Sequence, residues 1–261
     1  ELSAKQIKRL IEQRLVINDI DIVFVASNRG NYENSNINKL NNLKKELPSI
    51  KFENFSLYYK DALVEKNLKD KTLKIIAKNV DSIVAIFGEN VEEWEIEYNG
   101  FKSDQLFSYP YNLTGCLNFF TKSIAIKKII VFDAKCEDAI NFINTNGYVK
   151  QIGIYKAYSD GIDSDFSNIN FEEIEVFNAK NDCVDFSYGK YLIKKIKLNQ
   201  CRDKGISVGE ASILDIKNLN VSNSSIGVAS KDSSLVNLNL TNIYEVKKCV
   251  AIYNKKFEFN S

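Results

Sequence analysis

Apolar side chains in the middle of the chain recur at every second residue within short runs, and the runs recur at a fixed interval. Four isoleucines are spaced 22 residues apart, at Ile130, Ile152, Ile174 and Ile196. Each is followed two positions later by another apolar residue, at Phe132, Ile154, Val176 and Leu198. Alternation of this kind predicts a strand with one buried face. The chain therefore carries a series of equivalent strands.

A second series has the same 22-residue spacing and begins with polar residues. Its first positions are Asp138, Asp160, Asp182, Lys204 and Ile226. A repeat of this length, built of strands, cannot bury its apolar face alone and stacks on its neighbours. We therefore predict an all-β solenoid over residues 72–261, a right-handed single-stranded parallel β-helix with 22-residue coils. Equivalent residues of neighbouring coils are then about 4.8 Å apart.

Residues 1–71 do not follow the repeat, and they predict a small α/β capping segment over the first coil. The pattern favours helices at Ser3–Leu15 and Lys39–Leu47 and strands at Ile20–Ala26 and Phe52–Tyr59. The Asn-rich stretch Asn31–Asn42 reads as a loop that leads into the second helix. The end of a β-helix exposes an unpaired strand edge, which such a segment would cover. Residues 101–113 are aromatic-rich and out of register, so we expect a protruding loop there.

Composition narrows the function classes. The net charge of +1 gives no basic face for nucleic acid. No apolar run approaches the roughly 18 residues that span a membrane. There is no histidine, which removes the commonest general base and the commonest zinc ligand. The chain opens with Glu1 rather than Met, so we expect it to be part of a longer chain.

The five cysteines are an odd number and show no metal-ligand spacing. Several occupy apolar repeat positions, so we predict reduced, buried thiols, with Cys183 and Cys201 both unpaired. Reduced thiols fit either the bacterial cytoplasm or a cell surface, and the localisation stays open.

Chemistry, if the chain has any, is expected on the outer face of the strands that begin at the polar positions. Alternation directs Asp163, Asp185 and Ser207 outward, with Asp160, Asp182 and Lys204 in a parallel column. Like charges opposite each other destabilise a sheet. A bound divalent cation, the neighbouring lysines or raised pKa values would offset that cost. Alternatively, these aspartates sit at solvated turns, where repulsion is screened.

The strands also carry a series of short motifs. They read Tyr158-Ser159-Asp160-Gly161-Ile162-Asp163, Asn181-Asp182-Cys183-Val184-Asp185, Lys204-Gly205-Ile206-Ser207-Val208-Gly209 and Ala229-Ser230-Lys231. Over residues 155–232 this series resembles the four motifs of the polygalacturonase-type glycoside hydrolases, within the pectate-lyase-like β-helix superfamily. The resemblance implies a right-handed β-helix that acts on a polysaccharide. It places Asp160 and Asp182 at the positions that activate water in an inverting mechanism.

Three motif positions depart from that family. The general acid is replaced by Asn181, which cannot donate a proton as a carboxylic acid does. The family's histidine is Lys204 and its substrate-binding arginine is Ala229, while Lys231 is retained. With these replacements, Lys204 beside Asp182 could suit an elimination on an acidic sugar instead of hydrolysis.

Two classes of function follow from the sequence. In one, the chain is a hydrolase, lyase or epimerase whose catalytic residues are Asp160, Asp182 and Lys204. Its substrate-binding residues are then Asp163, Asp185, Ser207 and Lys231. In the other, which we favour, it is a polysaccharide-associated domain that binds a polysaccharide or acidic glycan through the same column, or a purely structural solenoid. No cofactor is required in either class, although a divalent cation could take part.

Overall fold

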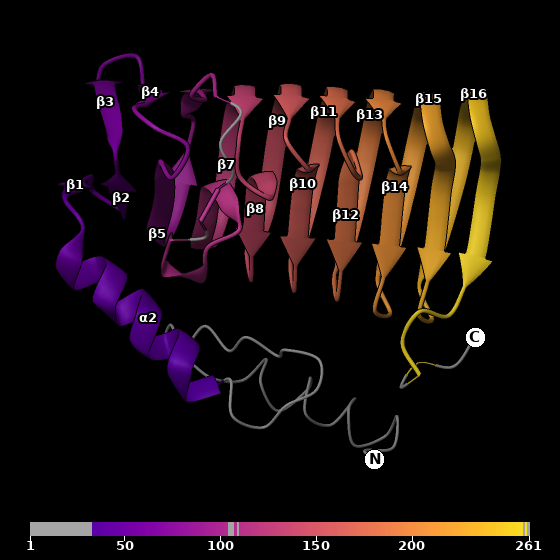
Figure 1. The fold of residues 1–261 in the computed structure, drawn as a ribbon, viewed down its shortest axis with the longest axis horizontal. Coiled ribbons are helices and arrows are strands. Elements are labelled where there is room, and N and C mark those ends of the chain that lie inside the picture. The colour runs from indigo at the N-terminus through magenta and orange to yellow at the C-terminus, as the bar shows by residue number, and fades with distance from the viewer. Residues whose placement is uncertain (1–32, 104–106, 109, 258, 260–261) are drawn as a thin grey trace.

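A computed structural model describes residues 33–103, 107–108, 110–257 and 259, with side chains described from Leu40 onward. The predicted helix Ser3–Leu15 and strand Ile20–Ala26 lie outside the described residues. The described chain forms a parallel β-solenoid of about eight turns, which confirms the predicted fold class. In Figure 1 the turns follow one another along a single axis, with two rows of strands facing each other across the stack.

The strands of the two rows alternate along the chain. One row holds β8 (Asp138–Ile143), β10 (Asp160–Asp165), β12 (Val184–Ser187) and β14 (Lys204–Gly209). The other holds β9 (Asn146–Ala157), β11 (Asn168–Ala179) and β13 (Lys190–Cys201). Longer strands bend through both rows at the two ends, namely β7 (Gly115–Ala134), β15 (Ile213–Lys231) and β16 (Leu235–Tyr253). All of these strands pair in parallel with the equivalent strand of the next coil.

The pairing register agrees with the 22-residue step except in one coil. Ile152, Ile174 and Ile196 are direct partners across β9, β11 and β13. The partner of Ile152 in β7, however, is Ile129, and Ile130 is opposite Gly153. The prediction for Ile130 was therefore wrong by one position, because this coil has one extra residue. Ile129 is fully buried and Ile130 faces outward.

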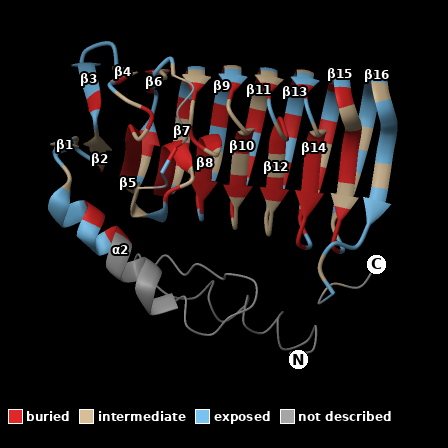
Figure 2. Cartoon of the chain, viewed as in Figure 1, coloured by how far each residue is buried: buried red, intermediate tan, exposed pale blue. Residues whose placement is uncertain are grey.

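The interior is a continuous apolar column, visible as the buried residues that run through the strands from β4 to β15 in Figure 2. Ile152, Ile174 and Ile196 stack one above another and are at most 1% exposed. Large rings fill the wider part of the coils, where Phe186 stacks on Tyr191 with ring centroids 4.1 Å apart. The Tyr191 hydroxyl donates to the Ser164 carbonyl at 2.7 Å, which satisfies this polar group inside the apolar column.

One bend of each coil is made by a residue in the left-handed backbone region. Its φ lies between 52° and 75° in Asp133, Lys156, Asn178, Gln200, Asn223 and Glu245. Asn and Asp tolerate this conformation better than other side chains, and most of these residues are polar. The polar residues between the apolar runs therefore place the corners of the solenoid.

The N-terminal part of the described chain covers the first coils with antiparallel strands. Helix α2 (Glu33–Glu46) is followed by β1 (Ser49–Lys51), β2 (Phe55–Lys60) and β3 (Ala62–Asn67). Strand β2 pairs antiparallel with β5 (Ile83–Glu92), and β3 with β4 (Thr72–Ala77). The first parallel pair joins β4 to β6 (Glu95–Asn99), close to the predicted start of the coils. The division into two domains at residue 71 stays a prediction.

Two local predictions in this part are partly correct. The second helix was expected at Lys39–Leu47 after a loop, but α2 begins already at Glu33. The out-of-register stretch 101–113 contains no strand among its described residues and ends in the short helix η1 (Pro110–Asn112). Phe107 and Leu113 from this stretch are buried, so it packs against the first coils.

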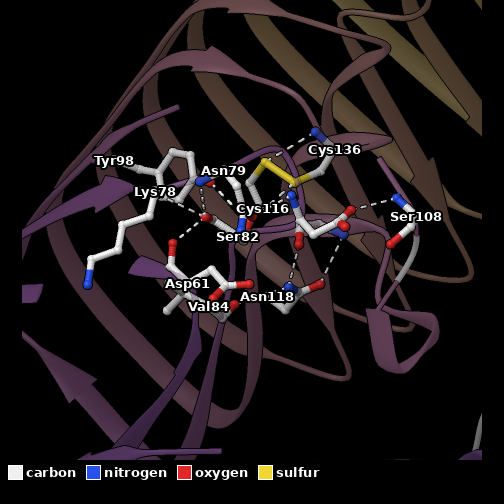
Figure 3. Close-up of a disulfide and its surroundings, with 12 residues drawn as sticks. Asp61, Lys78, Asn79, Ser82, Val84, Tyr98, Ser108, Cys116, Asn118 and Cys136 are labelled. Atoms are coloured by element: carbon white, nitrogen blue, oxygen red, sulfur yellow. Dashed lines mark hydrogen bonds between the residues drawn. A yellow bond between two sulfur atoms is a disulfide. The ribbon is translucent and has the colours of Figure 1, made fainter. Parts of the chain in front are cut away.

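A disulfide joins Cys116 to Cys136 beside the first coils (Figure 3). Next to it, the Ser82 hydroxyl accepts hydrogen bonds from the Lys78 and Asn79 amides at 3.0 and 3.2 Å. The Asn118 side chain donates to the carbonyls of Val84 and Gly115 at 3.0 and 2.6 Å. The first two contacts close the turn at residues 78–82, and the bond from Asn118 to Val84 ties β7 to β5.

A second disulfide joins Cys183 to Cys201, so the prediction of reduced thiols at these positions was wrong. The two residues are 18 apart in sequence, and both point into the interior of one coil. Burial of a cysteine was read as evidence for a free thiol. Burial also brings two cysteines together when they lie on opposite sides of the same narrow coil.

Candidate functional site

The predicted residues share one side of the solenoid, formed by β8, β10, β12, β14 and the second half of β15. Their outward side chains form three columns, which we call the Asp/Lys face. The first column is Asp138, Asp160, Asp182 and Lys204; the second is Asn141, Asp163, Asp185 and Ser207; the third includes Asp165, Ser187 and Lys231. The structure therefore brings all seven predicted site residues to one side of the coil stack.

Asp160 faces outward because the alternation of the strand breaks directly after it. Gly161 and Ile162 are both buried, and Asp163 faces outward again. A Cβ atom on Gly161 would lie 2.5 Å from the Cys183 carbonyl oxygen. Only glycine fits this close approach between neighbouring coils, so the Asp-Gly sequence has a structural cause.

The first column is a ladder of hydrogen bonds between coils. An Asp160 carboxylate oxygen accepts from the Asp182 backbone amide at 2.8 Å. An Asp182 oxygen accepts from the Lys204 amide at 3.0 Å. Asp160 and Asp182 therefore have a structural role, because their hydrogen bonds hold neighbouring coils together.

Asp182 and Lys204 also form an ion pair. The Lys204 ammonium lies 3.2 Å from both oxygens of Asp182 and contacts Asp203 as well. Burial acts to lower the pKa of Lys204, but the hydrogen bonds and charges of Asp203 and Asp182 outweigh it and raise that pKa. Lys204 is therefore a fixed cation. Asp182 is 3% exposed, and both of its oxygens are occupied.

The second and third columns are joined at Asp185. The Lys231 ammonium lies 3.7 Å from an Asp185 oxygen, and Lys231 is 5% exposed. Burial raises the pKa of Asp185, while Lys231 and Ser207 act in the opposite direction. Ser207 is fully buried, so of this group only Asp185 reaches the surface.

Crowding and burial keep several carboxyl groups of the face close to neutral. Burial, with the charge of Asp182 added, raises the pKa of Asp160 to about 7. Burial, with the charge of Asp185 added, raises the pKa of Asp165 to about 7. Burial also places the pKa of Asp138 and of Asp163 well above the ordinary value. The raised pKa values predicted as one offset for the stacked charges are therefore present.

Three acidic contributors to this face were not among the predicted site residues. Asp138 and Asp165 belong to the same columns, and the 22-residue spacing could have found them. Glu210 could not have been found by spacing, because it lies in a turn. It accepts a hydrogen bond from Ser187 at 2.6 Å and pairs with Lys256 of the C-terminal tail at 2.5 Å.

The accessible part of the face is narrower than predicted. Asp160, Asp163, Asp165 and Asp185 are partly exposed, whereas Asp182, Ser207 and Lys231 are buried.

Within the described residues, no group of three or more His, Cys, Asp or Glu side chains is arranged to hold a metal ion. A hollow of about 430 Å³ lies elsewhere, on the other row, and is lined by Lys195, Lys197, Asn218, Asn220 and Leu240 among others.

Comparison with known proteins gives no match: no family model, no curated protein and no solved structure is detectably similar to this chain. The polygalacturonase-type motifs thus remain a resemblance, and the fold is what the structure shows. In the described part of the chain, none of the helices combines the length and the apolar character needed to cross a membrane.

Proposed function

We propose that the chain is a glycan-binding β-helix domain that does not turn over its ligand. The observation that carries the proposal is a cluster of partly exposed aspartates on two neighbouring coils. Asp160, Asp163 and Asp165 follow one another along β10, and Asp185 of β12 is the partner of Asp163 in the next coil. Ionised carboxylates accept hydrogen bonds from sugar hydroxyls, and protonated ones also donate. An array on a rigid stack suits an extended, hydroxyl-rich chain.

The contacts of the first column favour binding over catalysis. A general base needs a free oxygen within reach of the proton that it removes. Both oxygens of Asp182 are engaged by Lys204. Asn181 cannot supply the proton for the leaving group, and Lys204 is held as a cation. No pair of free acid and base remains among the residues that the motifs align.

The charge of the face favours a neutral glycan over an acidic one. Six aspartates contribute to it, against Lys204 and Lys231. Both lysines are already paired with aspartates, so neither offers a free ammonium to a sugar carboxylate. A neutral, hydroxyl-rich ligand needs no free ammonium, and it avoids the repulsion that an anionic polymer would meet once the face loses its protons above about pH 7. A divalent cation between Asp163 and Asp185 would be needed for an acidic glycan.

One observation keeps an enzyme as the second candidate. A general acid or base works best with a pKa near the working pH, and the pKa of Asp160 is about 7. Asp160 also has a partly exposed side chain. A hydrolase, lyase or epimerase would then use Asp160, with a proton donor contributed by the substrate or by a neighbouring carboxyl group such as Asp163.

The test is binding of the protein to a panel of neutral and acidic polysaccharides by affinity electrophoresis, with and without a chelator. We expect retardation by at least one neutral polysaccharide, unchanged by the chelator. Asp163→Asn should reduce it at least about fivefold, because a hydrogen bond contributes about 1 kcal/mol. Glu173→Gln is the matched control, since Glu173 faces outward on the other row. Equal losses in both variants, or retardation only by acidic polysaccharides, would contradict the proposal.

A further inference from the structure

Strand β16 is the last described strand of the solenoid, and one of its edges is open among the described residues. It pairs with β15 on one side over residues 235–253. Among the described residues no strand pairs with its other side. A long edge of unpaired backbone amides and carbonyls readily accepts another strand.

At inward-facing positions, the apolar side chains of this last coil are more exposed than the equivalent residues of earlier coils. Val250 is 51% exposed, whereas its partner in β15, Val228, is 1% exposed. Ile252 is 82% exposed. Apolar groups that line the interior of the solenoid thus face solvent at this end, and a patch of this kind marks an interaction surface.

Cys249 gives a second, independent sign that this end is incomplete. It occupies the coil position of Cys183, which lies 66 residues, or three 22-residue steps, before it and is fully buried in a disulfide. Cys249 itself is exposed and not in a disulfide. The coil position shared by Cys183 and Cys249 is therefore buried in the earlier coil and open to solvent in the last one.

The described residues after β16 do not cover this end. The tail turns back toward earlier coils, where Asp232 accepts hydrogen bonds from the Lys255 and Lys256 amides at 2.6 and 2.8 Å. Lys256 then reaches Glu210, and Phe259 contacts Tyr188 with ring centroids 6.1 Å apart. The other end of the stack differs, because the antiparallel strands β2 and β3 pair with β5 and β4 there, and among the described residues only the short strands β1 and β3 keep an unpaired edge.

We propose that the β16 end binds a second copy of this chain, end to end, in a closed twofold dimer. The unpaired strands at the opposite end, β1 and β3, have only three and six residues against the 19 of β16, so a head-to-tail contact would leave most of the β16 edge unpaired, whereas two β16 edges can pair with each other. In an antiparallel pair centred between Val246 and Lys247, Glu245 of one copy lies opposite Lys248 of the other. Opposite charges in cross-strand positions stabilise such a pair.

The dimer is tested by size-exclusion chromatography with light scattering on the whole chain. We expect twice the chain mass for the wild type and the single chain mass for Ile252→Lys, which puts a charge into the apolar end. Leu63→Lys is the matched control, because Leu63 is an exposed leucine on β3 at the other end. It should stay dimeric. A monomeric wild type, a larger assembly, or a dimer that survives Ile252→Lys would overturn the proposal.

A second measurement does not depend on a substitution. In the dimer Cys249 is covered, so its alkylation by a maleimide should slow at least about tenfold between dilute and concentrated protein, as the monomer fraction falls. A rate constant that does not depend on protein concentration, with the dimer present throughout, would overturn the assigned interface.

Discussion

In the first column of the Asp/Lys face, two aspartates each have a structural cost and a structural role at the same time. Asp160 and Asp182 accept backbone hydrogen bonds from the following coil, which favours the carboxylate. Burial and neighbouring carboxyl groups favour the neutral form instead, and this effect is the larger one. Asp160 and Asp182 therefore stay protonated to a higher pH than exposed aspartates do.

This balance predicts how stability depends on pH. The pKa of Asp160 and of Asp165 is about 7 in the folded chain, against an ordinary value of 3.8. A raised pKa adds stability that is complete below the unfolded pKa and is lost as pH rises through the folded pKa. We expect the midpoint of thermal unfolding to fall between pH 5 and pH 8.

The double variant Asp160→Asn/Asp165→Asn should flatten this fall, because it removes two of the titrating groups and leaves a side-chain oxygen for the Asp182 amide. Differential scanning calorimetry at several pH values measures how the unfolding midpoint changes with pH in the wild type and in the double variant. A wild-type midpoint that rises from pH 5 to pH 8 would show that the folded pKa values are not raised.

The glycine next to Asp160 gives a second prediction at this scale. Gly161→Ala forces a Cβ atom to within 2.5 Å of a backbone carbonyl, so the coils must move apart. Overpacking of this kind costs about 1 to 3 kcal/mol. At Gly209 the nearest atom to an added Cβ is the Lys231 side chain at 3.4 Å, so Gly209→Ala is the control. Urea unfolding should show a clear decrease in the free energy of unfolding for Gly161→Ala and a smaller decrease for Gly209→Ala.

At the scale of the strands, the sequence predicted more of the fold than of the site. The 22-residue step placed the strands and the outward columns because every coil repeats the same packing. It missed the shift at Ile129 and Ile130, since one inserted residue leaves the local alternation of apolar residues intact. It could not show that Lys204 occupies both oxygens of Asp182, because rotamers and contacts are set by the packed coil.

The disulfides also could not be predicted from the sequence pattern. Spacing of 18 and 20 residues matched no known pairing pattern, and only the width of the coil brings each pair together. We expect a non-reducing digest to contain the peptides Cys116–Cys136 and Cys183–Cys201 as linked pairs. Free thiols at these four positions in protein prepared without reductant would contradict the structure.

The disulfides should also contribute to stability. Each closes a loop of 20 residues or fewer, for which the entropic effect is about 3 kcal/mol. The variant Cys183→Ala/Cys201→Ala should therefore unfold at a lower temperature than the wild type. Cys249→Ala is the control, because Cys249 is exposed and unpaired. Equal midpoints in the two variants would show that the Cys183–Cys201 bond adds no stability.

At the scale of the whole molecule, binding and turnover make different demands on the same face. A binding domain needs a rigid array of donors and acceptors, which the stacked coils supply. An enzyme also needs a free acid and a free base. If Asp160 is such a group, Asp160→Asn should lower product formation by orders of magnitude while the fold persists. We expect instead that mass spectrometry finds the bound glycan unchanged after prolonged incubation with the wild type.

The central claim is that a glycan occupies the Asp/Lys face, and hydrogen exchange of the protein with and without a bound neutral oligosaccharide tests it most directly. Both rows of strands belong to the same coils, so general stabilisation would slow exchange in both. The account predicts slower exchange in residues 160–165 and 184–187, with little change in β11 and β13. Protection confined to β11 and β13, or spread equally over both rows, would contradict it.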